Sequence, residues 1–430
     1  MQNLLDNLIL YNASGDHVLE LTAKAVSEDT DQKRKNACRM AIRALLNFAA
    51  EHGLSGNLWH GYVAYYIAAD INPFSLEQER YTEEVVESTT VYELGFRDCQ
   101  TLKKLFDWSM PEDSPMGACW RDAVTKHERA DSDKPDSGEV ISQFISRLEA
   151  AKDEKEFFME TADFYKATGA GTVGINRGFT VTADGSGEAK LKAVRNMENI
   201  SLSDLVGYEV QKQKLTENTE AFLAGRPANN VLLYGDGGTG KSTSIRAISS
   251  MYWRQGLRII QVYRHQMQYL GQIIELIKNR NYKFIIYMDD LSFEDFETEY
   301  KYLKAVIEGG LETRPKNVLI YATSNRRHLI KETWGDRSDM SHEGEIHRSD
   351  STEEKLSLSE RFGVQIYYGK PTKDQFHNIV ELLAVREKID MTLEKLHKEA
   401  TKWEIRHGGV SGRSARQFID YIKGTEEHFK

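Results

Sequence analysis

The chain contains only three cysteines in 430 residues, Cys38, Cys99 and Cys119, and none lies after residue 119. An odd number of widely spaced cysteines provides neither a disulfide framework nor the paired spacing of a zinc ribbon. A secreted disulfide scaffold and a cysteine-ligated metal domain are therefore excluded. A reducing, cytoplasmic location is the expectation that follows.

Long apolar runs are also missing. No uninterrupted stretch approaches the roughly 18 residues that a membrane span requires, and the opening sequence MQNLLDNLIL lacks the basic region and cleavage site of a signal peptide. The hydrophobic fraction of 40% and the charged fraction of 28% are typical of a soluble globular protein. We therefore expect no membrane partner.

Neither half of the chain has the basic excess of a dedicated nucleic-acid binder. Residues 1–200 hold 33 acidic and 22 basic side chains, a net charge of −11. The remaining residues hold 33 acidic and 34 basic side chains, a net charge of +1. Local basic clusters remain compatible with phosphate contacts, but steering onto duplex DNA is not the leading hypothesis.

The hydrophobic pattern divides the chain into four sections. We predict a mostly helical acidic domain at 1–155, with helices at 33–52 and 58–69, and a small β-containing linker at 156–200, with short strands at 172–173 and 179–181. After residue 200, apolar strand runs alternate with helical stretches at 266–278 and 298–308, which predicts a parallel sheet covered by helices. This αβ core spans 201–370, and its strands are expected at 230–234, 257–262, 284–288, 318–322 and 364–368.

The last section, 371–430, is predicted to be a helical subdomain. Thr372 and Gln375 form a capping box, which marks the start of a helix. The apolar residues that follow lie on one stripe of that helix, namely Phe376, Ile379, Val380, Leu383 and Ala384.

The strongest chemical signal is a glycine-rich segment between a strand and a helix, with the pattern GxxxxGK[ST] of a phosphate-binding loop. Glycines allow successive backbone N–H groups to point at phosphate oxygens, and the helix adds its positive N-terminal end. Lys241 is expected to reach the β- and γ-phosphates of ATP, and the Ser242 hydroxyl to ligate Mg²⁺. The predicted nucleotide-binding residues here are Gly235, Asp236, Gly237, Gly238, Thr239, Gly240, Lys241, Ser242 and Thr243.

Polar residues end two of the predicted strands. Asp289 and Asp290 follow the strand at 284–288, where Asp289 is the expected carboxylate on the metal side and Asp290 the group that polarises the attacking water. Glu294 is the alternative base. The strand at 318–322 ends in Thr323-Ser324-Asn325, and Asn325 is expected beside the γ-phosphate.

The order of these elements resembles that of an AAA+ ATPase. The segments LVGYEVQKQKL, LLYGDGGTGKST, FIIYMDDLSFED, VLIYATSNRRHL, LSLSERFG and SGRSARQF together resemble one uncharacterised family of predicted bacterial AAA+ ATPases, over roughly residues 155–425. That family has no established activity, so it implies a mechanism but no substrate. More distantly, the module is similar to bacterial helicase loaders and transposition helper ATPases.

The resemblance implies further site residues. Asn325 matches the sensor-one position, and Arg361 matches the arginine finger that reaches the γ-phosphate of a neighbouring subunit. Arg416 matches sensor two on the lid, with Arg413 as the alternative. The stretch that lines the adenine corresponds to Val206, Gly207 and Tyr208. The departure from the family pattern is Asp290 in place of glutamate, which bears on hydrolysis rather than on binding.

The sequence therefore predicts an enzyme that binds and hydrolyses ATP with Mg²⁺, assembles with copies of itself, and remodels or loads a macromolecular partner. The acidic N-terminal section and the near-neutral core favour a protein partner over nucleic acid. The alternatives are a nucleic-acid-associated helper ATPase and a nucleotide-gated switch or scaffold with little turnover. A small-molecule kinase is disfavoured, because it would need neither the lid arginine nor the finger.

Two weaker patterns remain in the sequence. The aromatic cluster at 59–66 is interpreted as core rather than as a recognition surface. The charged insert at 331–355 is interpreted as a surface loop.

Overall fold

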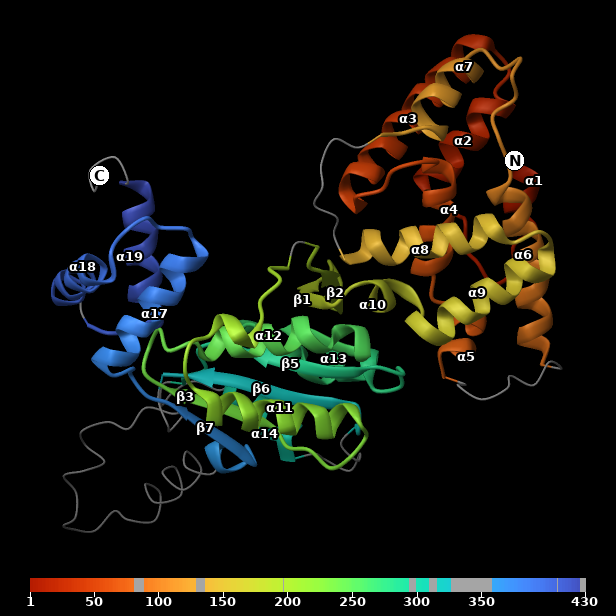
Figure 1. Ribbon diagram of the computed structural model, residues 1–430. Coiled ribbons are helices and arrows are strands. Elements are labelled where there is room, and N and C mark those ends of the chain that lie inside the picture. The colour runs from red at the N-terminus through yellow and green to blue at the C-terminus, as the bar shows by residue number, and fades with distance from the viewer. Residues whose placement is uncertain are drawn as a thin grey trace. The chain divides into compact units, whose positions relative to one another are not determined.

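The structure is a computed structural model that describes residues 1–80, 89–128, 136–195, 197–293, 299–308, 315–325, 358–407 and 409–425. The chain forms two compact units (Figure 1). The first comprises Met1–Arg177 with Ala193–Met197, and the second comprises Gly178–Lys192 with Glu198–Lys430. The charged insert predicted at 331–355 lies outside the described residues, as does Glu294.

The first unit is helical in the part of it that the structure describes. Its elements are α1 (Gln2–Leu5), α2 (His17–Ser27), α3 (Asp31–His52), α4 (Leu58–Ala69), α5 (Pro73–Arg80), α6 (Thr90–Phe106), α7 (Gly117–Trp120), the π-helix η1 (Arg121–Thr125), α8 (Asp136–Ala150), α9 (Glu154–Thr168) and α10 (Gly171–Ile175).

Local signals explain the two helices predicted in this unit, both of which are confirmed. The side chain of Thr30 accepts a hydrogen bond from the backbone N–H of Lys33 at the start of α3, and Gly53 ends the helix in the left-handed conformation. Asn57 caps α4 by accepting from the backbone N–H groups of its first turn. These caps satisfy backbone groups that a helix end leaves without partners.

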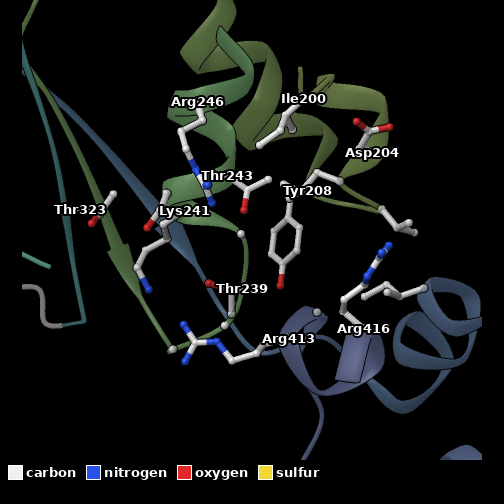
Figure 2. A pocket seen from close by; sticks show the side chains of 18 of the residues that line it. Ile200, Asp204, Tyr208, Thr239, Lys241, Thr243, Arg246, Thr323, Arg413 and Arg416 are labelled. Carbon is white, nitrogen blue, oxygen red and sulfur yellow. The ribbon is translucent and has the colours of Figure 1, made fainter. Parts of the chain in front are cut away.

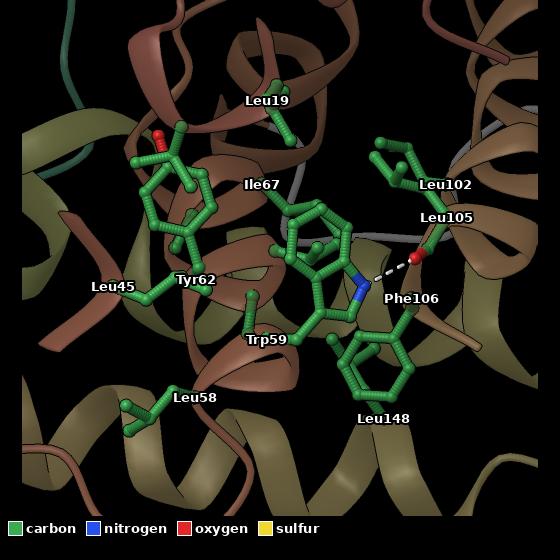
Figure 3. Packing of buried hydrophobic residues seen from close by; sticks show 14 of the residues in the cluster. Leu19, Leu45, Leu58, Trp59, Tyr62, Ile67, Leu102, Leu105, Phe106 and Leu148 are labelled. Atoms are coloured by element: carbon green, nitrogen blue, oxygen red, sulfur yellow. Dashed lines mark hydrogen bonds between the residues drawn. The ribbon is translucent and has the colours of Figure 1, made fainter. Parts of the chain in front are cut away.

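The aromatic cluster on α4 is core, as predicted. Trp59 is 2% exposed, and its indole Nε1–H donates to the carbonyl oxygen of Leu105 over 2.8 Å (Figure 3). Tyr62 is buried as well, and its hydroxyl donates to Asp16. The hydrogen bonds of Trp59 and Tyr62 offset the desolvation cost of burying the polar atoms of these two rings.

The second unit is built on a seven-stranded sheet in the order β2-β1-β4-β5-β6-β3-β7. The pairs from β1 through β7 are parallel, which confirms the predicted α/β class. All five predicted strands are present. The strands are β1 (Gly178–Ala183), β2 (Ala189–Ala193), β3 (Val231–Gly235), β4 (Leu257–Gln261), β5 (Lys283–Met288), β6 (Val318–Ser324) and β7 (Val364–Tyr368).

The order of the strands determines which face of the sheet each connecting helix covers. The chain steps from β3 to β4 in one direction across the sheet and from β4 through β5 to β6 in the other. Right-handed crossovers therefore put α12 (Lys241–Tyr252) on one face, and α13 (Leu270–Ile277) and α14 (Glu299–Glu308) on the opposite face. The elements are η2 (Leu202–Asp204), α11 (Glu209–Leu223), α12 (Lys241–Tyr252), η3 (Trp253–Gln255), η4 (Arg264–Tyr269), α13 (Leu270–Ile277) and α14 (Glu299–Glu308).

Two predictions of local structure need correction. Residues 172–173 are not a strand but lie in the short helix α10, where Gly171 has a positive φ and Val173 is buried. The helix predicted at 266–278 begins as the 3-10 turn η4, and regular α-helix starts only at Leu270. In both places an apolar side chain is buried, Val173 in α10 and Met267 in η4. The strand predicted at 179–181 is confirmed as part of β1.

The C-terminal helices α17 (Lys373–Arg386), α18 (Leu393–Arg406) and α19 (Gly412–Gly424) form a small bundle with its own core, which we call the lid (Figure 1). The capping box of Thr372 and Gln375 starts α17 as predicted. The predicted apolar stripe of α17 is buried against residues such as Leu396 and Phe418 of the other two helices. The helical lid is thereby confirmed.

Candidate functional site

The phosphate-binding loop joins the end of β3 to the start of α12. Gly235, Gly238 and Gly240 have φ values of 133°, 75° and 95°, a region that residues with a side chain rarely adopt. A Cβ atom on Gly235 would lie 2.2 Å from the carbonyl oxygen of Tyr368 in the neighbouring strand. The loop conformation therefore depends on glycine at this position.

Lys241 lies at the first position of α12 and is 6% exposed. Its Nζ donates to the carbonyl oxygens of Gly235 and Asp236 at 2.9 and 2.6 Å and to Oδ1 of Asn325 at 3.1 Å. Burial lowers the pKa of Lys241. The ammonium group is thus held inside the loop by acceptors that a bound phosphate could replace (Figure 2).

Two hydroxyl groups converge on the first carboxylate after β5. Ser242 Oγ and Thr323 Oγ1 each donate to Oδ1 of Asp289, both over 2.6 Å. Partial burial would raise the pKa of Asp289, but these hydrogen bonds outweigh it, and the pKa lies below its usual value. Asp289 is therefore an ionised carboxylate, able to act as a metal ligand, next to a serine hydroxyl.

The second carboxylate is held by the end of β6. Asp290 has a φ of +50°, the left-handed region, which costs a non-glycine residue about 1–2 kcal/mol. Its Oδ1 accepts from Nδ2 of Asn325 at 2.7 Å, and its backbone N–H donates to Thr323 Oγ1 at 2.9 Å. Since Asn325 also accepts from Lys241, one amide links the loop cation to Asp290.

A cavity of about 880 Å³ extends from these residues to the lid. Of the residues predicted to line the adenine, Val206 and Tyr208 line the cavity, and Gly207 between them has a positive φ. The Tyr208 ring stacks on Tyr368 at 5.1 Å between centroids, and its hydroxyl donates to the carbonyl oxygen of Gly369. Ile379 and Leu383 of α17 supply an apolar wall from the lid.

The predicted site residues do not all reach this cavity. Asp289, Asp290 and Asn325 line it, and so does every loop residue from Gly237 to Thr243. Gly207, Gly235 and Asp236 do not; Asp236 instead accepts a hydrogen bond from the backbone N–H of Lys370.

Three arginines predicted from the resemblance occupy different settings. Arg416 lines the cavity, but its guanidinium pairs with Glu387 at 3.0 Å and Asp420 at 3.2 Å. The alternative, Arg413, extends toward the phosphate loop (Figure 2), and its backbone N–H donates to the Gly238 carbonyl at 3.3 Å. Arg361 does not line the cavity and pairs with Glu308 at 3.0 Å.

Sequence reasoning missed several residues of the site. Thr323 was noted only as part of a polar strand end, and its position two residues before Asn325 was the one available signal. Arg246 lines the cavity one turn after Ser242. Asp204 pairs at 2.9 Å with Arg386 of the lid helix α17. No spacing rule links residues 204 and 386, because only the folded chain brings them together.

The residues present fit a magnesium nucleotide. Mg²⁺ prefers oxygen ligands from hydroxyl groups, carboxylates and phosphates, and Ser242 Oγ and Asp289 Oδ1 already lie 2.6 Å apart. A helix N-terminus with a buried lysine fits a polyphosphate. Within the described residues there is no group of three or more His, Cys, Asp or Glu that could hold a metal by itself. A metal here would therefore depend on oxygen ligands from phosphate or water.

Three solved structures are similar to part of this chain. RuvB from Thermotoga maritima, titled a Holliday junction branch migration motor, shares 14% identity over 53% of this chain and 72% of that chain, with a TM-score of 0.32. Two of its variants match with the same identity and TM-scores of 0.33, over 53% and 54% of this chain and 73% and 74% of theirs. Likeness at this level carries no argument about activity or partners. No curated protein matches the chain significantly.

The fold, the phosphate-binding loop and a family match together show which family the chain belongs to. The parallel sheet with a phosphate-binding loop after β3, an acid-ended β5 and a helical lid is the fold of an AAA+ P-loop ATPase. Residues 177–426, more than half of the chain, match a family described as "Protein of unknown function (DUF815)". The chain belongs to that family.

Proposed function

We propose that this protein binds and hydrolyses ATP at the cavity between the phosphate-binding loop and the lid. The observation that carries the proposal is the convergence of Lys241, Asn325 and Asp290 through two hydrogen bonds, at 3.1 and 2.7 Å, at the mouth of a glycine-rich loop. Phosphoryl transfer to water requires a cation that binds the phosphates and polar groups that orient and deprotonate the water. Lys241 is such a cation, and the Asn325 amide and the Asp290 carboxylate are such polar groups.

The cavity offers separate places for the two ends of the nucleotide. Backbone N–H groups of the loop and the start of α12 would hold the phosphates, and Lys241 would exchange its carbonyl partners for phosphate oxygens. At the other end, Val206 and Tyr208 from the core and Ile379 and Leu383 from the lid would enclose the base. Because core and lid both contribute, binding would draw them together.

Ser242 and Asp289 would hold Mg²⁺, Ser242 directly and Asp289 through water. When bound, the ion supplies positive charge beside the β- and γ-phosphates. Asp289 is suited to this role, because an aspartate is ionised at neutral pH and its lowered pKa extends the ionised state to more acidic pH.

Asp290 and Asn325 would act on the attacking water. Asp290 is the general base that takes its proton, and Asn325 orients the water. In the nucleotide-free structure these two side chains bond to each other instead. The Asn325 amide would therefore have to release Asp290, or share it with the water, when ATP occupies the cavity.

The lid arginine would neutralise charge on the γ-phosphate. Arg416 is the residue predicted from the resemblance, but two lid carboxylates hold it. Arg413 lies against the loop through the Gly238 carbonyl. We therefore include both in the proposal and give Arg413 the γ-phosphate contact.

Arg361 is proposed to act in a neighbouring subunit, which makes self-assembly part of the mechanism. It does not line the cavity of its own chain, and its side chain is 47% exposed even when paired with Glu308. A guanidinium on the surface can reach a site on another copy only if the copies assemble. The bond to Glu308 would have to open in that assembly.

The work done with ATP is proposed to be the remodelling or loading of a protein partner, and the acidic residues 1–200 favour protein over nucleic acid. ATPase stimulation by DNA or RNA that fades steeply with salt would favour the nucleic-acid helper instead. A switch with little turnover is the second candidate, because Asp290 is both shorter than glutamate and engaged by Asn325.

The remaining parts of the proposal concern location and domain roles. The three cysteines are free thiols, two buried and one exposed, which fits a reducing cytoplasm. None of the described helices combines the length and the low polarity that crossing a bilayer demands. We propose a partner-binding role for residues 1–155, with the core at 201–370 and the lid at 371–430. The compact units divide at Arg177, so the segment predicted as a linker, 156–200, is shared between the two units.

The proposal is tested first by nucleotide binding. We expect the wild-type protein to bind ATP, and Lys241→Ala to bind it at least about 100-fold more weakly, since two charge-assisted bonds of about 1.5–3 kcal/mol each are lost. Lys278→Ala, which removes a surface lysine paired with Glu275, is the matched control. Equal ATP affinity in wild-type and Lys241→Ala protein would refute the site.

A further inference from the structure

Thr323, the penultimate residue of β6, contacts the acidic turn after β5 at three points. Its Oγ1–H donates to Oδ1 of Asp289 at 2.6 Å, and the same oxygen accepts from the backbone N–H of Asp290 at 2.9 Å. Its carbonyl oxygen accepts from the backbone N–H of Leu291 at 2.7 Å. Consecutive residues of the turn are thus all bonded to this one residue.

The chemistry of the hydroxyl group explains why a threonine side chain can do this. A hydroxyl has one proton to donate and two lone pairs to accept with. Since the proton is committed to the Asp289 carboxylate, the lone pairs face the Asp290 N–H. Thr323 is 1% exposed, so its hydroxyl group would be left without a partner if these bonds were lost, which is costly for a buried polar group.

The two bonds act on the two carboxylates in different ways. The bond to Asp289 occupies Oδ1, which also accepts from Ser242, and a carboxylate has about four acceptor positions in all. The orientation of the Asp289 carboxylate is therefore fixed, while its remaining acceptor positions are free to accept hydrogen bonds from water bound to a metal. The bond from Asp290 N–H supports the left-handed backbone, φ +50°, that directs the Asp290 side chain toward Asn325.

We propose that Thr323 is a positioning residue for hydrolysis, which sets Asp289 for magnesium and Asp290 for water through a single hydroxyl group. The inference rests on the proposed function of the same site. It assigns to Thr323 no contact with substrate. It predicts that the hydroxyl, rather than the bulk of the side chain, is what the site requires.

The test compares Thr323→Val, which keeps the shape and removes the hydroxyl, with Thr323→Ser, which keeps the hydroxyl. Affinity for a non-hydrolysable ATP analogue is measured by titration in EDTA and again with saturating Mg²⁺, so that the gain due to magnesium is obtained without any turnover. We expect the three proteins to bind the analogue equally in EDTA. The magnesium-dependent gain should fall about tenfold or more in Thr323→Val, and stay within about threefold of wild type in Thr323→Ser.

A second readout is the Mg²⁺ concentration that gives half-maximal ATP hydrolysis, which should rise in Thr323→Val and be restored in Thr323→Ser. Thermal melting identifies a variant that fails to fold, in which case Thr323→Ser and Thr323→Ala are compared. An unchanged magnesium gain in Thr323→Val, or an equal loss in Val and Ser variants, would overturn the inference. Failure of the wild-type protein to bind the nucleotide even with saturating Mg²⁺ would instead refute the proposed function.

Discussion

Asp290 provides the sharpest test of the chemistry, because replacement by asparagine should hardly change stability and should greatly slow turnover. The variant Asp290→Asn keeps the size of the side chain and an oxygen that can accept from Nδ2 of Asn325. It removes the negative charge and, with it, the ability to take a proton from water. We therefore expect a folded protein that binds ATP and barely hydrolyses it.

The magnitude for stability follows from two opposing effects. The φ of +50° at position 290 is tolerated better by asparagine than by most residues, so part of the about 1–2 kcal/mol strain is relieved. Against this, Lys241 loses the favourable charge of Asp290, an effect of about 1 kcal/mol because Asp290 itself is exposed to solvent. The free energy of unfolding should therefore change by no more than about 1 kcal/mol.

The magnitude for catalysis is much larger. Loss of a positioned general base costs about 10²–10⁴-fold in rate, so phosphate release in a single turnover should slow by that factor while ATP affinity stays within about threefold. Asp374→Asn, the same chemical change at an exposed position in the first turn of α17, is the control. Turnover by Asp290→Asn within about threefold of wild type would refute the role of Asp290 and direct attention to Glu294, the alternative base.

Two further predictions concern the lid and the N-terminal unit. Arg413→Ala should slow ATP hydrolysis more than Arg416→Ala does, by about tenfold or more. The reason is that Arg413 lies at the phosphate-binding loop, whereas Arg416 is held by lid carboxylates. The reverse order in steady-state rates would contradict the γ-phosphate contact proposed for Arg413. Burial lowers the pKa of His52 to about 4, so its contribution to stability is complete above the unfolded pKa of about 6.5 and is lost as the pH falls toward 4. Chemical denaturation of His52→Phe should accordingly show a shallower fall in stability over this window, by up to about 3 kcal/mol, and an unchanged pH profile would mean that His52 is not buried as a neutral ring.

Much of the second unit could be predicted from the sequence, because its signals are local. A buried parallel strand is a short apolar run, and β7 has the predicted bounds, Val364–Tyr368. The capping box at Thr372 specifies a helix start through contacts within four residues. The phosphate loop is fixed by glycines whose φ values no other residue adopts readily.

Other features could not be predicted, because they depend on partners distant in sequence. The helix at 172–173 has the β-branched residues of a strand, but Val173 is buried in a turn that begins at Gly171. The pairing of Arg416 with Glu387 depends on how α17 and α19 pack. Likewise, Thr323 reaches Asp289 only because β5 and β6 are neighbours with a particular register.

The central claim is that assembled copies of this protein hydrolyse ATP at shared sites, and steady-state phosphate release across a wide range of protein concentration tests it most directly. Lys241→Ala sets the background, and Arg361→Ala removes the proposed finger. We predict that the rate per subunit rises with concentration in wild-type protein and stays low in Arg361→Ala. A wild-type rate equal to that of Lys241→Ala at every concentration, despite tight ATP binding, would contradict the claim and favour a nucleotide-gated switch.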